Sequence, residues 1–184
     1  MKPWRRQCDE FTKFARKLQV LISVDTNVLL DQAQNDGDVL DALQTIRAKV
    51  RAAQMIITPT VLEELGKFSQ GTDERAEDSN RILDEMLSWG YTPYPSIPIA
   101  RGIVGQTALR IRAAGLVPEE EVNDSFVISE AAHFNCAMLL STDSHLASID
   151  RRGLKCLLGN EHASNPSLIL ASPREIVKKF FPSR

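Results

Sequence analysis

The 184-residue chain has the composition of a globular domain, with 43% hydrophobic and 25% charged residues. These values argue against collagen-like, disordered and coiled-coil classes. Its formal net charge of −2 means that any nucleic-acid binding must come from local patches. The aliphatic run Val20–Val24 is too short for a membrane span or a signal-peptide core. Because Cys8, Cys136 and Cys156 lack disulfide or zinc-site spacing, we expect a cytoplasmic protein without a membrane partner.

The first 20 residues differ from the rest of the chain. Six basic residues against two acidic ones make this stretch +4, and Phe11, Phe14 and Leu18 fall at helical spacing. We expect a basic N-terminal helical extension over residues 1–20 that packs on a single domain over residues 21–184. The alternative is a basic arm that contacts nucleic acid or a partner protein.

From residue 21 onward, short apolar runs alternate with longer helical patterns. Strands are predicted at 21–24, 55–58, 137–140, 155–158 and 168–170, and residues 92–98 are predicted to be an extended connector. Helices are predicted at about 40–50, after Pro59, at 82–87, at 99–114, from an Asn123 cap, and after Ser172-Pro173. Apolar strands without alternation that are separated by helices indicate a parallel sheet covered on both faces. The predicted fold class is α/β, a parallel sheet of about five strands flanked by helices.

Carboxylates follow several of the predicted strands. In open α/β sheets the functional site lies outside the carboxyl ends of the strands. Four separate segments bring a carboxylate to that edge, namely Asp25, the pair Glu63-Glu64, Asp124 and Asp143. Like charges placed together repel one another unless a cation neutralises them or one of them is protonated.

The residue types also indicate which cation would suit this edge. Carboxylate oxygens suit Mg²⁺ or Mn²⁺, and the absence of cysteine and of paired histidine at these positions argues against zinc. Such ions activate water and stabilise the charge that develops during phosphodiester hydrolysis. The sequence therefore predicts a metal-dependent hydrolase site at one edge of the sheet.

Four sequence blocks resemble, in order, the PIN-domain nucleases, a family that includes the toxins of VapC-type toxin–antitoxin pairs. The blocks are 24–30 (VDTNVLL), 61–65 (VLEEL), 123–128 (NDSFVI) and 139–143 (LLSTD), and the closing 172–175 is also similar. The resemblance covers roughly residues 21–180. Three features depart from the family pattern: Ser141 in place of a frequent threonine, Leu146 in place of a frequent aromatic residue, and the basic segment that precedes the domain.

The resemblance implies a Mg²⁺- or Mn²⁺-dependent endoribonuclease with RNA as its substrate. It also implies a small antitoxin as a candidate partner and a homodimer as a candidate assembly. By motif position, the catalytic and metal-binding residues would be Asp25, Glu64, Asp124 and Asp143, with Asn27 and Ser141 as supporting residues. The alternative is a non-catalytic PIN-like module that binds RNA or protein. A haloacid-dehalogenase-type phosphatase is disfavoured, because that chemistry needs a second aspartate where Asn27 stands.

Glu63 and Glu64 are adjacent, so only one of them is expected to point into the site. Residues next to each other on a helix diverge by about 100°. If Thr60 is the N-cap, Glu63 completes a capping box; if Thr58 is the N-cap and Pro59 the first helical residue, Glu63 has no such role. In either case Glu64 lies on the more apolar, inward side of the helix. We therefore predict that Glu64 belongs to the site and that Glu63 has a structural or surface role.

Overall fold

The computed structural model describes residues 19–95 and 98–181. The helical extension predicted over residues 1–20 lies almost entirely outside these described residues. Five strands form one sheet in which all neighbours are parallel, in the order β3-β2-β1-β4-β5. Their bounds are β1 Val20–Val24, β2 Ala53–Ile57, β3 Tyr91–Pro93, β4 Met138–Leu140 and β5 Ile169–Ala171. The predicted α/β class with a five-stranded parallel sheet is confirmed.

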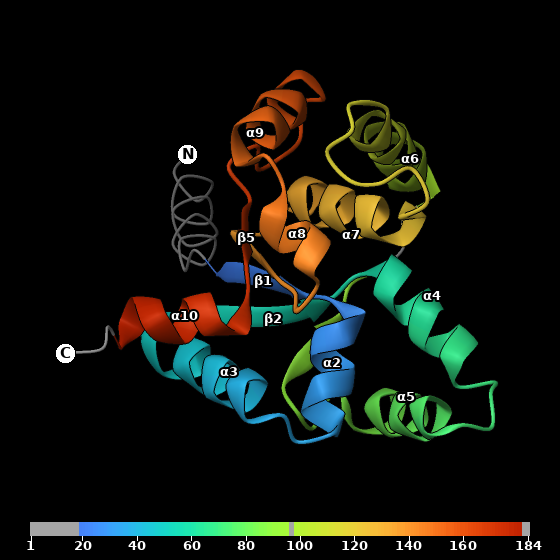
Figure 1. The fold of residues 1–184 in the computed structure, drawn as a ribbon, viewed down its shortest axis with the longest axis vertical. Coiled ribbons are helices and arrows are strands. Elements are labelled where there is room, and N and C mark those ends of the chain that lie inside the picture. The colour runs from blue at the N-terminus through green and yellow to red at the C-terminus, as the bar shows by residue number, and fades with distance from the viewer. Residues whose placement is uncertain (1–18, 96–97, 182–184) are drawn as a thin grey trace, which may run out of the picture.

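Helices cover both faces of the sheet (Figure 1). Their bounds are α2 Thr26–Ala33, α3 Gly37–Lys49, α4 Pro59–Phe68, α5 Glu74–Glu85, α6 Pro98–Ala113, α7 Val122–His133, α8 Ser144–Ser148, α9 Arg151–Asn160 and α10 Pro173–Phe180. Helices α3 and α10 pack together below the sheet in Figure 1, and α6 packs on α7 above it. In the described ranges no helix has the length and apolar character needed to cross a membrane.

The two central strands are buried on both faces, which explains why their sequences lack alternation. In β1, Ile22, Ser23 and Val24 are all fully buried, and in β2 both Ile56 and Ile57 are buried. Side chains from both faces of the sheet thus enter one continuous core. Each Å² of apolar surface that is buried on folding contributes about 25 cal/mol of stabilising free energy. This core is therefore the main source of the protein's stability.

The strand predicted at residues 155–158 is wrong, because this segment lies inside α9. Leu154 and Leu158, four residues apart, are buried on one face of the helix. Asp150 caps the helix by accepting a hydrogen bond from the Arg152 amide at 3.0 Å. Side chains four residues apart lie on the same face of a helix. The segment is therefore helical, although its short apolar run also resembles a strand.

The fifth strand of the sheet is instead β3, at the start of the predicted connector 92–98. Tyr91 is buried and pairs with Met55 of β2, so this segment joins the edge of the sheet. Pro93 is tolerated there because an edge strand has one side without ladder partners. Helix α2, which follows β1 after the single residue Asp25, was also not predicted.

Candidate functional site

The carboxyl ends of the strands meet at one edge of the sheet, as parallel pairing requires. Val24, the last residue of β1, pairs in register with Leu140, the last residue of β4. The residues that follow, Asp25 and Ser141, therefore lie side by side. The strand order runs outward from β1 through β2 and β3 on one side and through β4 and β5 on the other. Ligand sites of open α/β sheets lie in the crevice at such a reversal.

Asp25 is held in a fixed orientation by two hydrogen bonds. Its side chain is almost completely buried, with the residue 5% exposed. One carboxylate oxygen accepts from the Thr26 amide at 2.8 Å, and the other accepts from the Ser141 hydroxyl at 2.6 Å. Ser141 Oγ in turn accepts from the Asp143 amide at 3.0 Å. The ends of β1 and β4 are thus joined by a continuous hydrogen-bonded path.

Glu64 points into this edge, whereas its neighbour Glu63 points away from it. Glu64 is half-buried, and its two carboxylate oxygens accept from the Thr26 hydroxyl and from Asn123 Nδ2, the latter at 3.0 Å. Glu63 is exposed and forms an ion pair with Arg101 of α6. The two side chains therefore diverge, as their positions on the helix require.

The start of α4 follows the second of the two arrangements considered from the sequence. Thr58 is the N-cap and Pro59 is the first helical residue. The capping box between Thr60 and Glu63 is therefore not formed. Proline is favoured at this position because its missing amide hydrogen would have no helical acceptor there.

Asn123 does not cap α7, which corrects the prediction. The helix begins at Val122 with Glu121 as its N-cap, and no side-chain capping bond is made. Asn123 lies within the first turn, where its amide group is free to reach Glu64 on α4. Asp124 follows it, half-buried, and its Oδ2 atom is buried with no hydrogen-bond partner among the described residues.

The surroundings of Asp25 make its ionised form less favourable than it is in water. Burial raises the pKa of Asp25 from 3.8 to about 6. The hydrogen bonds from Ser141 and Thr26 oppose this shift, and the negative charges of Glu64 and Asp143 add to it. The buried carboxylate is therefore stabilised by donors but not by a positive charge.

Asp124 is perturbed in the same direction. Burial is the main cause that raises the pKa of Asp124 from 3.8 to about 7. The charges of Asp25, Asp143, Glu121 and Glu64 follow in that order. The sequence motifs do not indicate that Glu121 lies close to Asp124. The one sequence feature that points to it is its position at the end of a run of glutamates, three residues before Asp124. Carboxylates from three helices and the end of β1 thus repel one another at this edge.

The remaining predicted residues occupy the border of the site. Asp143 is the N-cap of α8, and its Oδ1 atom accepts from the His145 amide at 2.6 Å. Asn27 is half-buried in α2, and its side chain makes no hydrogen bond with the described residues. Within residues 19–95 and 98–181, no three acidic, histidine or cysteine side chains stand close enough together to hold an ion as they are placed.

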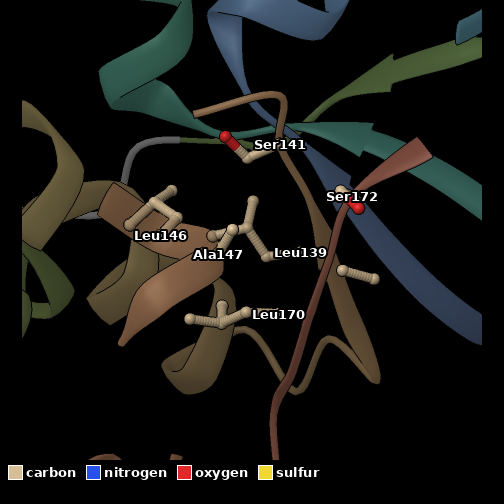
Figure 2. Close-up of a pocket in the computed structure, with 7 residues that line it drawn as sticks. Leu139, Ser141, Leu146, Ala147, Leu170 and Ser172 are labelled. Atoms are coloured by element: carbon tan, nitrogen blue, oxygen red, sulfur yellow. The ribbon is translucent and has the colours of Figure 1, made fainter. Parts of the chain in front are cut away.

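A small pocket beside Ser141 is part of the packing and not of the acidic site. Figure 2 shows Leu139, Leu146 and Leu170 around it, and its polar lining residues are Ser141 and Ser172. It lies between α8 and the strands β4 and β5, and no carboxylate of the described residues lines it. Leu146, which replaces an aromatic residue frequent in the resembled family, is buried here.

Thr26, like Glu121, has a role at the site that the sequence motifs do not indicate. Its amide donates to Asp25 and its hydroxyl donates to Glu64, so one residue joins two of the four carboxylates. Its position directly after Asp25 was a signal, but the pairing with Glu64 across 38 residues depends on how α4 packs.

Comparison with known proteins supports the fold. No protein-family model matches the chain, and no curated protein matches it. Solved structures do match. A chain of VapBC2 from Rickettsia felis, bound to a promoter DNA fragment, aligns at a TM-score of 0.58 and 17% identity, over 83% of this chain and 98% of the other. A chain of VapBC-1 from nontypeable Haemophilus influenzae gives 0.54 and 13%, over 84% and 99%.

A third structure, FitAB bound to an IR36 DNA fragment, aligns at a TM-score of 0.50 and 14% identity, over 83% of this chain and 94% of the other. The described chain therefore has the fold of a PIN-domain toxin, as the sequence motifs indicated. At these identities the likeness concerns the fold, and the chemistry has to be argued from the residues.

Proposed function

We propose that this protein is a Mg²⁺- or Mn²⁺-dependent endoribonuclease whose ion is held by Asp25, Glu64, Asp124 and Asp143. The observation that carries the proposal is the state of Asp124. Its Oδ2 atom is buried and lacks a donor among the described residues, and burial, followed by the charges of four acidic neighbours, raises its pKa. A buried oxygen without a partner is costly, and a cation at this edge would remove both the missing contact and the repulsion.

The donor set suits the proposed ion. All four groups are carboxylates, the hard oxygen ligands that Mg²⁺ and Mn²⁺ favour. When bound, a divalent ion at this edge would supply an activated water and charge stabilisation for phosphodiester hydrolysis. Because no three of the described carboxylates are grouped for ligation as placed, binding requires side-chain rotation, for which half-buried Glu64 and Asp143 have more freedom than Asp25.

The polar neighbours of the carboxylates orient them. Ser141 and Thr26 fix both oxygens of Asp25, and Asn123 and Thr26 fix those of Glu64. Partners of metal ligands orient the ligands and tune their affinity for the ion. Ser141 is proposed as a supporting residue because its hydroxyl donates to Asp25. Asn27 is proposed for the same role, but its side chain makes no such hydrogen bond with the described residues.

RNA is the proposed substrate, and Arg112 provides a local positive charge for it. Arg112 is half-buried at the end of α6 and donates to the hydroxyl of Ser125, the residue next to Asp124. It also lines an open groove together with His145, which is two residues from Asp143. Guanidinium groups bind phosphate well, so Arg112 is the proposed phosphate contact of this groove, which Glu119 and Asp150 also line.

The proposed partner is a small antitoxin protein, since the similar VapBC and FitAB structures are complexes. A homodimer and a cytoplasmic location belong to the same proposal. An alternative function, a non-catalytic module that binds RNA or protein, is favoured by one observation: the carboxylates are not grouped for metal ligation as they stand.

The deciding experiment is cleavage of single-stranded RNA by the full chain with Mn²⁺, with Mg²⁺ and with a chelator. We expect metal-dependent cleavage that is lost in Asp25→Asn and Asp124→Asn. Asp73→Asn is the matched control, because Asp73 caps α5 and is not among the carboxylates that raise the pKa of Asp25 or Asp124. Metal-independent cleavage by the wild type, or full activity in Asp124→Asn, would contradict the proposal. If the protein binds RNA but does not cleave it in any of the three conditions, the result would support the non-catalytic module.

A further inference from the structure

Glu130 is a buried acidic side chain outside the group of four carboxylates. It lies on α7, is 5% exposed, and both of its carboxylate oxygens face Thr60 of α4. Oε2 accepts from the Thr60 amide at 3.1 Å, and Oε1 accepts from the Thr60 hydroxyl at 2.9 Å. No lysine or arginine within the described ranges forms an ion pair with it. Burial raises the pKa of Glu130, and the hydroxyl of Thr58, together with the amide and hydroxyl of Thr60, opposes that shift.

These contacts supply what the N-terminus of α4 lacks. The amides of the first helical turn have no acceptor within the helix. The N-cap residue Thr58 makes no side-chain capping bond, and Pro59 has no amide hydrogen. Glu130 provides both an acceptor and a negative charge, which is favourable at the positive end of a helix. The capping group of α4 therefore comes from a different helix.

The same faces of α4 and α7 also make the contact between Asn123 and Glu64. Thr60 and Glu64 are four residues apart, so they share one face of α4. Asn123 and Glu130 are seven residues apart, two turns along the same face of α7. Two cross-links therefore join these faces, Thr60 with Glu130 and Glu64 with Asn123, the latter at 3.0 Å. Together they fix how α4 lies against α7.

We propose that Glu130 is a positioning residue: by holding the first turn of α4 against α7, it places Glu64 beside Asn123 and Asp124. The inference rests on the proposed function in one respect only, that Glu64 is a ligand of the ion. The placement of Glu64 itself can be tested without metal or substrate, so the two claims can fail separately.

The first test is a double-mutant cycle in denaturant unfolding of the full chain, without metal. Glu130 and Asn123 are about 10 Å apart along α7, a separation at which unconnected residues have additive effects. Asn123→Ala lowers the folding equilibrium constant by some factor in the wild type. We expect that factor to be smaller in the Glu130→Ala background, by about twofold or more. Additive effects would overturn the proposal. If Glu130→Ala does not fold, Thr60→Val, which removes only the hydroxyl donor, takes its place in the cycle.

The second test is Mn²⁺ affinity by titration calorimetry. Glu130→Ala is expected to bind Mn²⁺ about tenfold more weakly, the lower end of the loss when a group that orients a ligand is removed. Glu130→Gln keeps an acceptor for the Thr60 amide and should restore most of the affinity. The matched control is Ser129→Ala, because buried Ser129 donates to the Val104 carbonyl at 2.9 Å and so ties α7 to α6 instead.

The outcomes of the two tests are distinct. Weaker Mn²⁺ binding in Glu130→Ala but not in Ser129→Ala, with coupling to Asn123, supports the positioning role. Equal losses in both variants would mean that Glu130 only stabilises the fold, and would overturn it. A wild-type protein that binds no Mn²⁺ would contradict the proposed function, while the cycle would still decide whether Glu130 places Glu64.

Discussion

Replacing Asp25 by asparagine should stabilise the protein at high pH and not at low pH. Burial raises the pKa of Asp25 from 3.8 to about 6, and such a difference corresponds to roughly 3 kcal/mol. Above pH 6 the folded protein carries this buried charge, whereas the unfolded chain solvates it. The destabilisation is therefore complete above pH 6 and is lost as pH falls through the window between about 6 and 3.8.

Asparagine can keep the local contacts of Asp25. Its carbonyl oxygen can accept from the Thr26 amide, and its amide group can donate to Ser141 Oγ, which occupies the position opposite the second carboxylate oxygen. Allowing about 1 kcal/mol for a weaker hydrogen bond, the expected gain at pH 8 is about 2 kcal/mol. For a domain of this size that is a rise in Tm of roughly 4–8 °C.

The assay is thermal unfolding at pH 8 and pH 4 without divalent metal, followed by circular dichroism. Asp73→Asn is the matched control. Asp25 is the N-cap of α2 and Asp73 is the N-cap of α5, and each accepts a backbone amide, but Asp73 is not among the carboxylates that perturb Asp25 or Asp124. An Asp25→Asn protein that melts no higher than the wild type at pH 8 would show that the buried charge of Asp25 does not destabilise the fold. So would an equal gain at pH 4, because a pH-independent gain cannot come from a buried charge.

Three further predictions concern other parts of the chain. Glu64→Gln should weaken Mn²⁺ binding and cleavage, while Glu63→Gln leaves both near wild type; the reverse result in the two assays would overturn the assignment. Gly66→Ala should raise the free energy of unfolding by roughly 0.5–1 kcal/mol, measured with denaturant, because Gly66 is inside α4 with open space at its Cβ position. Gly90→Ala should lower the free energy of unfolding by about 1 kcal/mol, because Gly90 has a φ of +83°. Deleting residues 1–18 should lower Tm without changing the RNA affinity of the folded remainder, whereas a shallower salt dependence of binding would instead indicate a basic arm.

Much of the fold follows from local patterns in the sequence. The apolar segments of β1 and β2 are buried on both faces, so their lack of alternation correctly indicated a parallel sheet. The misassigned segment 155–158 shows the limit of this reasoning. A run of four residues fits a strand or a helix equally well, and the burial of Leu154 with Leu158 becomes visible only once α9 is packed.

The candidate site was predictable in its parts but not in its connections. Asp25 and Ser141 follow strands that pair directly, so topology alone brings them together. The bonds that Thr26 and Asn123 make to Glu64 depend instead on the angle between helices. Asparagine favours the N-cap position of helices, so the sequence predicts Asn123 as a cap. The N-cap of α7 is instead Glu121, two residues earlier, and the Asn123 side chain donates to Glu64.

Anomalous diffraction from crystals of the full chain soaked in Mn²⁺ would show directly whether the four carboxylates bind an ion. We expect one strong peak at the carboxyl edge of the sheet, within ligand distance of Asp124 and Asp25, with Glu64 and Asp143 rotated toward it. At that edge the buried oxygen of Asp124 should gain the partner that it lacks among the described residues. A peak away from these side chains, or none at Mn²⁺ concentrations that support RNA cleavage, would mean that these carboxylates do not hold the ion.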